Sequence, residues 1–158
     1  MHILMATVDA LKIPAVNLVL NRTSLQESRE ENRRIQYDES KSDFIDNLST
    51  NDRLVVHWDG KILNDLCGRS KVDRIAVLVS YNGSFKFLGA PKIESGTGKH
   101  IAQAVYNILV EWNISERVVA CSFDTTSSNT GHKSGACVLL EELLGRKLIY
   151  LACRHHCS

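Results

Sequence analysis

The feature that most constrains the fold is an alternation, beyond Asn51, of short apolar runs with segments of helical periodicity. The short runs have the length of strands and are 54–58, 75–80, 84–88, 118–123 and 147–152. Two longer segments, 97–112 and 136–144, repeat apolar residues every three or four positions, as one face of a helix does. The sequence therefore predicts an α/β domain with the order β-β-β-α-β-α-β.

The turns indicate how these elements pair. Asn82-Gly83 follows the second run and favours a tight antiparallel hairpin, because both residues tolerate positive φ. The later strands are linked by helices, which is typical of a mixed sheet. We expect a mixed five-stranded sheet with helices on its faces, and Gly145 as the C-terminal cap of the second helix.

The first part of the chain has a different texture, which predicts an N-terminal helical segment and polar linker over 1–50 and a separate domain over 51–158. From Arg22 to Asp43, 11 of 22 residues are charged, and Ser24–Glu27 has the spacing of a capping box. A solvent-exposed helix is the favoured interpretation, and a DNA-contacting helix is the alternative.

The apolar start, Met1 to Leu20, has no basic leader and is interrupted by Asp9, Lys12 and Pro14. It is expected to be neither a signal peptide nor a membrane span, so no membrane partner is predicted. Lys and Arg total 19 against 18 Asp and Glu, so charge neither supports nor excludes a DNA substrate. The odd number of cysteines, five, favours reduced thiols in an intracellular compartment over a disulfide framework.

Two aspartates come directly after apolar runs. Asp59 follows 54–58, and Asp124 follows 118–123. If these strands are neighbours with matched ends, the carboxylates converge, and such a pair of hard oxygen ligands suits Mg²⁺ or Mn²⁺. The alternative is that each aspartate begins a turn, since Asp-Gly is a good turn dipeptide and Asp124 can cap the following segment.

The residues after the fourth predicted strand carry a family resemblance. The segment Cys121–Thr126, the polar run Ser127–Asn129, a helix around Leu139, and the Cys153-x-x-His156 motif follow in this order. Together they resemble the second-aspartate block of hAT-type DDE transposases, which belong to the ribonuclease-H-like superfamily. The resemblance covers roughly residues 54–158 and implies a ribonuclease-H-like domain.

The resemblance implies that Asp59 and Asp124 are catalytic, metal-binding residues of a cut-and-paste transposase, which cleaves and joins DNA with Mg²⁺ or Mn²⁺. The family usually reads Asp-Gly-Trp after the first strand, whereas this chain has Trp58-Asp59-Gly60-Lys61, as in a diverged or domesticated element. The family's third carboxylate, a Glu on a helix after the fifth strand, has no counterpart in this chain. Its N-terminal zinc finger is missing from the first 50 residues as well.

The chain is therefore expected to be a fragment or remnant of a transposase catalytic domain, incomplete at its C-terminus and not competent by itself. The resemblance further implies DNA as partner, a possible homo-oligomer, and a location in the nucleus. The alternative is a non-enzymatic, transposase-derived module that binds DNA or protein through its N-terminal helices.

Other candidate sites have weaker support. Cys153 to Cys157 is dense in zinc ligands, but a structural zinc normally draws on two separated pairs; the resemblance instead implies a structural role for Cys153 and His156 beside the catalytic metals. Ser95–His100 resembles part of a phosphate loop without its full pattern, so a flexible start to the first helix is favoured. Cys121 and Cys137 fall in apolar patterns and are not expected to be nucleophiles.

Overall fold

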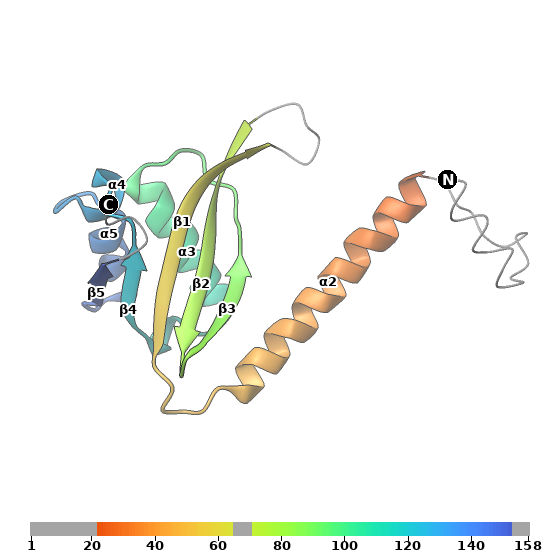
Figure 1. Cartoon of the computed structure of the whole chain (residues 1–158), viewed down its shortest axis with the longest axis horizontal. Coiled ribbons are helices and arrows are strands. Elements are labelled where there is room, and N and C mark those ends of the chain that lie inside the picture. Colours follow the sequence, from red (N-terminus) through yellow and green to blue (C-terminus); the bar gives the residue numbers. More distant parts are fainter. Residues whose placement is uncertain (1–21, 65–70, 153–158) are drawn as a thin grey trace, which may run out of the picture. The chain divides into compact units, whose positions relative to one another are not determined.

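The computed structural model describes residues 22–64 and 71–152 (Figure 1). The chain divides into two units, Met1–Asn47 and Leu48–Ser158, and each is described by itself. Across the described residues, no helix is both long enough and apolar enough to cross a membrane. Both candidate aspartates lie in the second unit.

Helix α2, Arg22–Asn47, is the described part of the first unit. Most of its side chains are exposed, and polar pairs join successive turns, for example Gln26 Nε2 to Glu30 Oε1 at 3.0 Å. Exposed pairs of this kind each contribute only about 0.5 kcal/mol. The predicted solvent-exposed helix is confirmed, and it continues past Asp43, where the charge-rich run ends.

The second unit is built on a five-stranded mixed sheet with the spatial order β3-β2-β1-β4-β5 (Figure 1). The strands are β1 Leu54–Asn64, β2 Lys71–Tyr81, β3 Ser84–Gly89, β4 Val118–Phe123 and β5 Ile149–Ala152. The β1–β2 and β2–β3 pairs are antiparallel, whereas β1–β4 and β4–β5 are parallel. The predicted α/β class and the five-stranded mixed sheet are confirmed.

Strand β1 is longer than the sequence predicts, because it continues through Asp59 and Gly60. Asp59 pairs with Ala76, Gly60 pairs with Ile75, and the antiparallel ladder runs on to Asn64. The prediction that Asp59 directly follows the first strand was therefore wrong. The turn preference of Asp-Gly is outweighed here by the backbone hydrogen bonds and side-chain packing of the ladder with β2.

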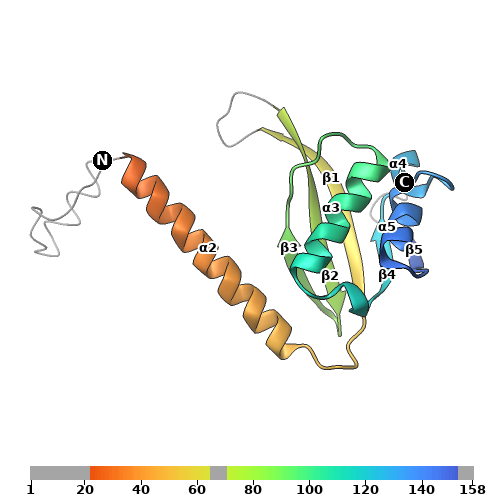
Figure 2. The ribbon, with the colours of Figure 1, turned by 180° about the vertical axis from the view of Figure 1, so that it is seen from behind.

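Helices α3, Gly98–Glu111, and α5, Ala136–Leu144, lie on the same face of the sheet (Figure 1, Figure 2). Alternate strand residues and the inward sides of these helices form the core, which includes Leu54, Val56, Trp58, Ile75, Val77, Val79, Ile101, Val105, Leu109, Ala136 and Leu140. Within residues 48–64 and 71–152, no helix covers the opposite face, where Phe85 and Phe87 are 70% and 55% exposed. The predicted helices on the faces of the sheet are thus found, in this part of the chain, on one face.

Two glycines have the conformations that the sequence predicts. Gly83, with Asn82, forms the hairpin turn between β2 and β3, at φ of 78° and 47°. Gly145 ends α5 with φ of 68°, and its N–H is bonded to the carbonyl of Glu142. Both positions lie in the left-handed region, which glycine enters without steric cost.

The start of α3 packs closely on the loop that precedes α5. Gly98 is buried, and a Cβ added there would overlap the carbonyl oxygen of Ser134 and lie 2.8 Å from that of Ser128. Ser95, just before α3, contacts the first turn of that helix, with Oγ 2.7 Å from His100 Nδ1. The glycine of this segment therefore allows close packing of two backbones.

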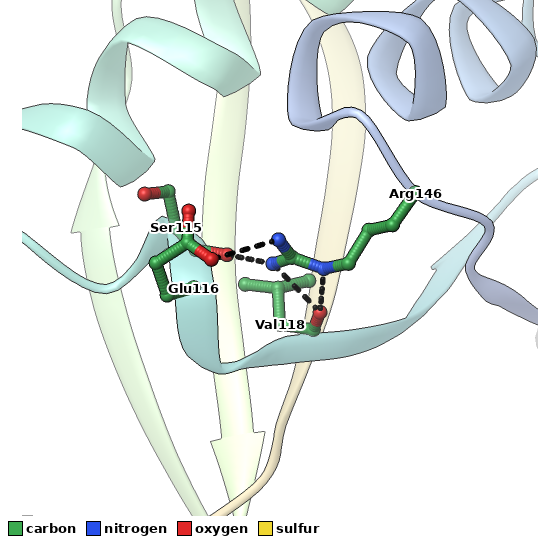
Figure 3. A network of polar contacts seen from close by, with 4 residues as sticks. All are labelled: Ser115, Glu116, Val118 and Arg146. Carbon is green, nitrogen blue, oxygen red and sulfur yellow. Dashed lines mark hydrogen bonds and ion pairs between the residues drawn. The ribbon is translucent and has the colours of Figure 1, made fainter.

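Arg146 joins the loop after α5 to the start of β4 (Figure 3). Its guanidinium donates to the carbonyl oxygens of Ser115 and Val118, and Nη1 lies 3.3 Å from Glu116 Oε2. Ser115 belongs to the short helix η2, Ser115–Arg117. The planar group, with several donors, thus satisfies carbonyl groups on both sides of the point where β4 begins.

Candidate metal-binding site

Asp59 lies within β1, directly after Trp58, and is partly buried. Because successive strand residues point to opposite faces, Trp58 enters the core on the α3 side while Asp59 extends from the open face. His57 is on the same side as Asp59, with Nε2 2.8 Å from Ser80 Oγ. Burial lowers the pKa of His57, so its ring is neutral at neutral pH.

Asp124 is the first residue after β4, the parallel neighbour of β1. In the register of these strands, Val56 is opposite Cys121 and His57 is opposite Ser122. Continuing this register by two residues brings Asp59 level with Asp124. The strands are neighbours, as the predicted convergence requires, but their ends are not matched, because β1 continues to Asn64 while β4 ends at Phe123.

Two side chains of the loop after β4 hold the Asp124 carboxylate. Thr126 Oγ1 donates to Asp124 Oδ1 at 2.9 Å. Asn129, in the short helix α4, Ser127–Thr130, donates through Nδ2 to the same oxygen. Within the described part of the chain both donors use Oδ1, so Oδ2 is left for a further ligand.

Asn129 is fixed in turn by Trp58. The indole Nε1 donates to Asn129 Oδ1 at 2.9 Å, and the ring stacks on Phe123 with centroids 4.4 Å apart. Trp58 and Asn129 are only 3% and 6% exposed. A buried amide whose donor and acceptor are both hydrogen-bonded has one orientation. Trp58 therefore orients Asn129, and Asn129 in turn orients the Asp124 carboxylate.

A cavity of about 280 Å³ opens beside this network, on the α3 side of the sheet. Its walls include Trp58, Ile75, Ile101, Asp124 and Asn129. Asp124 therefore borders the cavity, whereas Asp59 extends from the other face of β1.

The donor chemistry fits the hard cations that the sequence predicts. Mg²⁺ and Mn²⁺ prefer carboxylate oxygens and water, and they commonly bind through one or two carboxylates plus substrate oxygens. Among the described residues there is no group of three or more His, Cys, Asp or Glu side chains placed to hold a metal ion. The pair Asp59 and Asp124 would need water or substrate to complete the coordination.

Cys153 and His156, predicted to form a structural motif, lie outside the described residues. Their role beside the metal site and the alternative of a zinc ion at Cys153–Cys157 both remain predictions. The same holds for Mg²⁺ or Mn²⁺ as the bound ion.

Two features of this region were not predicted from the sequence. The contact of Trp58 with Asn129 was missed, although an indole N–H in a buried strand normally needs a polar partner, which was the available signal. The second is the contact between the thiols of Cys121 and Cys137. Their apolar patterns predicted burial but not proximity.

A scan of the chain against protein-family models found no match, and a search among curated proteins found none.

Proposed function

We propose that the second unit is a ribonuclease-H-like catalytic domain derived from an hAT-type DDE transposase, in which Asp59 and Asp124 bind Mg²⁺ or Mn²⁺. The observation that supports this most is the parallel pairing of β1 with β4, which makes the strands that carry or precede the two aspartates neighbours in the sheet. Carboxylates on neighbouring strands suit divalent ions that act on a phosphodiester.

Each residue of the site has a distinct part in this proposal. Asp59 and Asp124 would supply the oxygen ligands, and Thr126 and Asn129 hold Oδ1 of Asp124 by hydrogen bonds. Trp58 keeps the amide of Asn129 in the required orientation. When bound, the divalent ion supplies a Lewis acid for the phosphate and promotes deprotonation of the attacking water.

Cleavage and joining of DNA in the related transposases use a third carboxylate, which the resemblance implies on a helix after the fifth strand. Two aspartates alone bind a divalent ion weakly. We propose that these two aspartates bind the ion and do not by themselves support DNA cleavage. DNA as partner, assembly with further copies, and a nuclear location are parts of the same proposal.

A Mn²⁺ titration tests the site. The electron paramagnetic resonance signal of free Mn²⁺ reports how much of the ion the full chain binds. Asp59→Asn and Asp124→Asn each remove one charged ligand at constant side-chain size, and we expect each to weaken binding by about tenfold or more. Asp43→Asn, on the exposed surface of α2, is the matched control and should leave the affinity unchanged.

The outcome also separates the two candidate functions. Binding that is lost in Asp124→Asn supports the metal site. If the unmodified chain shows no Mn²⁺ binding that depends on Asp124, the metal site is refuted, and the alternative of a non-enzymatic DNA- or protein-binding module is retained.

A further inference from the structure

The thiols of Cys121 and Cys137 lie against each other between β4 and α5. Their Sγ atoms are 3.6 Å apart, and both cysteines are free. A disulfide has an S–S length of about 2.05 Å. A movement of less than about 2 Å would therefore bring these sulfurs to bonding distance.

The two thiols differ in their access to a small oxidant. Cys121 is buried in β4, whereas Cys137, in the first turn of α5, is partly exposed. Burial raises the pKa of both thiols; at Cys137 the Glu141 carboxylate adds to the rise, while Lys147 and the contact with Cys121 oppose it. Oxidation therefore begins at Cys137, and it is slow compared with oxidation of a thiolate.

We propose that Cys121 and Cys137 form a reversible disulfide when the protein meets hydrogen peroxide. The Cys137 sulfur attacks one peroxide oxygen, the O–O bond breaks, and a sulfenic acid and one water result. The Cys121 sulfur then attacks the sulfenic sulfur, the S–O bond breaks, and the hydroxyl leaves as a second water with the thiol proton of Cys121. The two thiols lose two electrons in total, which reduce the peroxide to two molecules of water.

This cross-link would close the segment that carries the candidate metal site. Residues 121–137 include Asp124, Thr126 and Asn129, which form the carboxylate network. A disulfide across a loop of this length restricts the unfolded chain and thereby stabilises the folded one. We expect the midpoint of thermal unfolding to rise by on the order of 5–10 °C after oxidation.

Peptide mapping of the full chain tests the proposal. The protein is treated with hydrogen peroxide in the presence of a chelator, remaining thiols are blocked with iodoacetamide, and trypsin is added. Cleavage after Arg117, Lys133 and Arg146 releases peptides 118–133 and 134–146, which carry one cysteine each. We expect these peptides to appear joined, lighter than their sum by two hydrogen atoms, and to separate with dithiothreitol.

Two variants complete the test. Cys137→Ser replaces one sulfur by a similar, smaller oxygen and should abolish both the joined peptide and the rise in unfolding temperature. Cys67→Ser leaves the pair intact and should retain both. Three results would each overturn the proposal. The first is recovery of both peptides as alkylated thiols, and the second is a bond from Cys137 to Cys67, Cys153 or Cys157. The third is a sulfinic acid at Cys137 beside an alkylated Cys121. The chelator makes these outcomes independent of metal binding at Asp124.

Discussion

Asn129 is the residue on which the orientation of Asp124 depends. Its side chain accepts a hydrogen bond from Trp58 Nε1 at 2.9 Å and donates to Asp124 Oδ1. Trp58 and Asn129 are both buried away from water. Leaving one partner of such a bond unsatisfied costs more than the bond itself contributes, because the remaining group has been desolvated without compensation.

Replacing Asn129 by Leu should therefore lower the free energy of unfolding by about 2 kcal/mol, measured by urea denaturation. In a Trp58→Phe background the same substitution should cost less, because the indole N–H that would be left unpaired is already gone. A double-mutant cycle isolates this difference. Equal costs in the two backgrounds would contradict the proposed coupling of Trp58 with Asn129.

Gly98 allows the start of α3 to approach the backbone of the loop before α5 closely. Gly98→Ala places a methyl group against the carbonyl oxygens of Ser128 and Ser134, and should destabilise the protein by about 2 kcal/mol or more. Gly96→Ala is the matched control, since a Cβ there has no atom within 4 Å, and it should change stability by less than about 0.5 kcal/mol. Similar midpoints of thermal unfolding for the two variants would argue against the close packing of α3 on this loop.

At the level of elements, the connection from α5 to β5 is held at two points. Glu141 accepts from the backbone N–H of Leu148 and from Lys147 Nζ, both at 2.8 Å. Arg146 bonds the carbonyl groups at the start of β4 (Figure 3). These contacts fix where β5 begins, although β5 itself has exposed side chains.

Glu141 should make this connection sensitive to acid. Burial alone raises the pKa of Glu141, but the hydrogen bonds from Leu148 and Lys147 outweigh it and leave the pKa below its ordinary value of 4.5. A carboxyl group whose pKa is lower in the folded state stabilises the protein above the unfolded pKa, and this stabilisation is lost as the pH falls through the folded pKa.

The unmodified protein should therefore be more stable than Glu141→Gln at pH 7, and the difference should shrink as the pH falls below 4.5. Urea midpoints measured between pH 7 and strongly acidic pH check this. Glu142→Gln, at an exposed neighbouring position, serves as control and should show no such trend. A constant difference between the unmodified protein and Glu141→Gln at all pH values would contradict the assignment.

The sequence predicted the ends of elements well where the residue after the element favours a turn or a helix cap. β4 has the predicted bounds, Val118–Phe123, and α5 ends at Gly145 as expected. β1 was predicted too short, because Asp59-Gly60 is a turn signal in isolation and only pairing with β2 extends the strand. Turn-forming residues end a strand only where backbone hydrogen bonds to a neighbouring strand do not continue past them.

The candidate site was predicted only in part, for a similar reason. Asp59 and Asp124 were found by their positions after apolar runs, a signal that is local to each strand. The contact of Trp58 with Asn129 joins residues 71 positions apart and depends on how the strands pack. Spacing along the chain does not contain that information.

At the level of the whole molecule, the sheet order decides which residues meet. β1 pairs with β2 on one side and with β4 on the other, so the chain passes through β2, β3 and α3 before it returns beside β1. Asp59 and Asp124 thereby belong to one unit, Leu48–Ser158.

The most direct test of the central claim is to locate bound Mn²⁺ by nuclear magnetic resonance on the ¹⁵N-labelled full chain. Substoichiometric Mn²⁺ should first broaden the amide signals of Asp59, Gly60, Asp124 and Thr125, and Asp124→Asn should abolish this pattern. Broadening that is centred on the acidic residues of α2, or that is unchanged in Asp124→Asn, would contradict a metal site between β1 and β4.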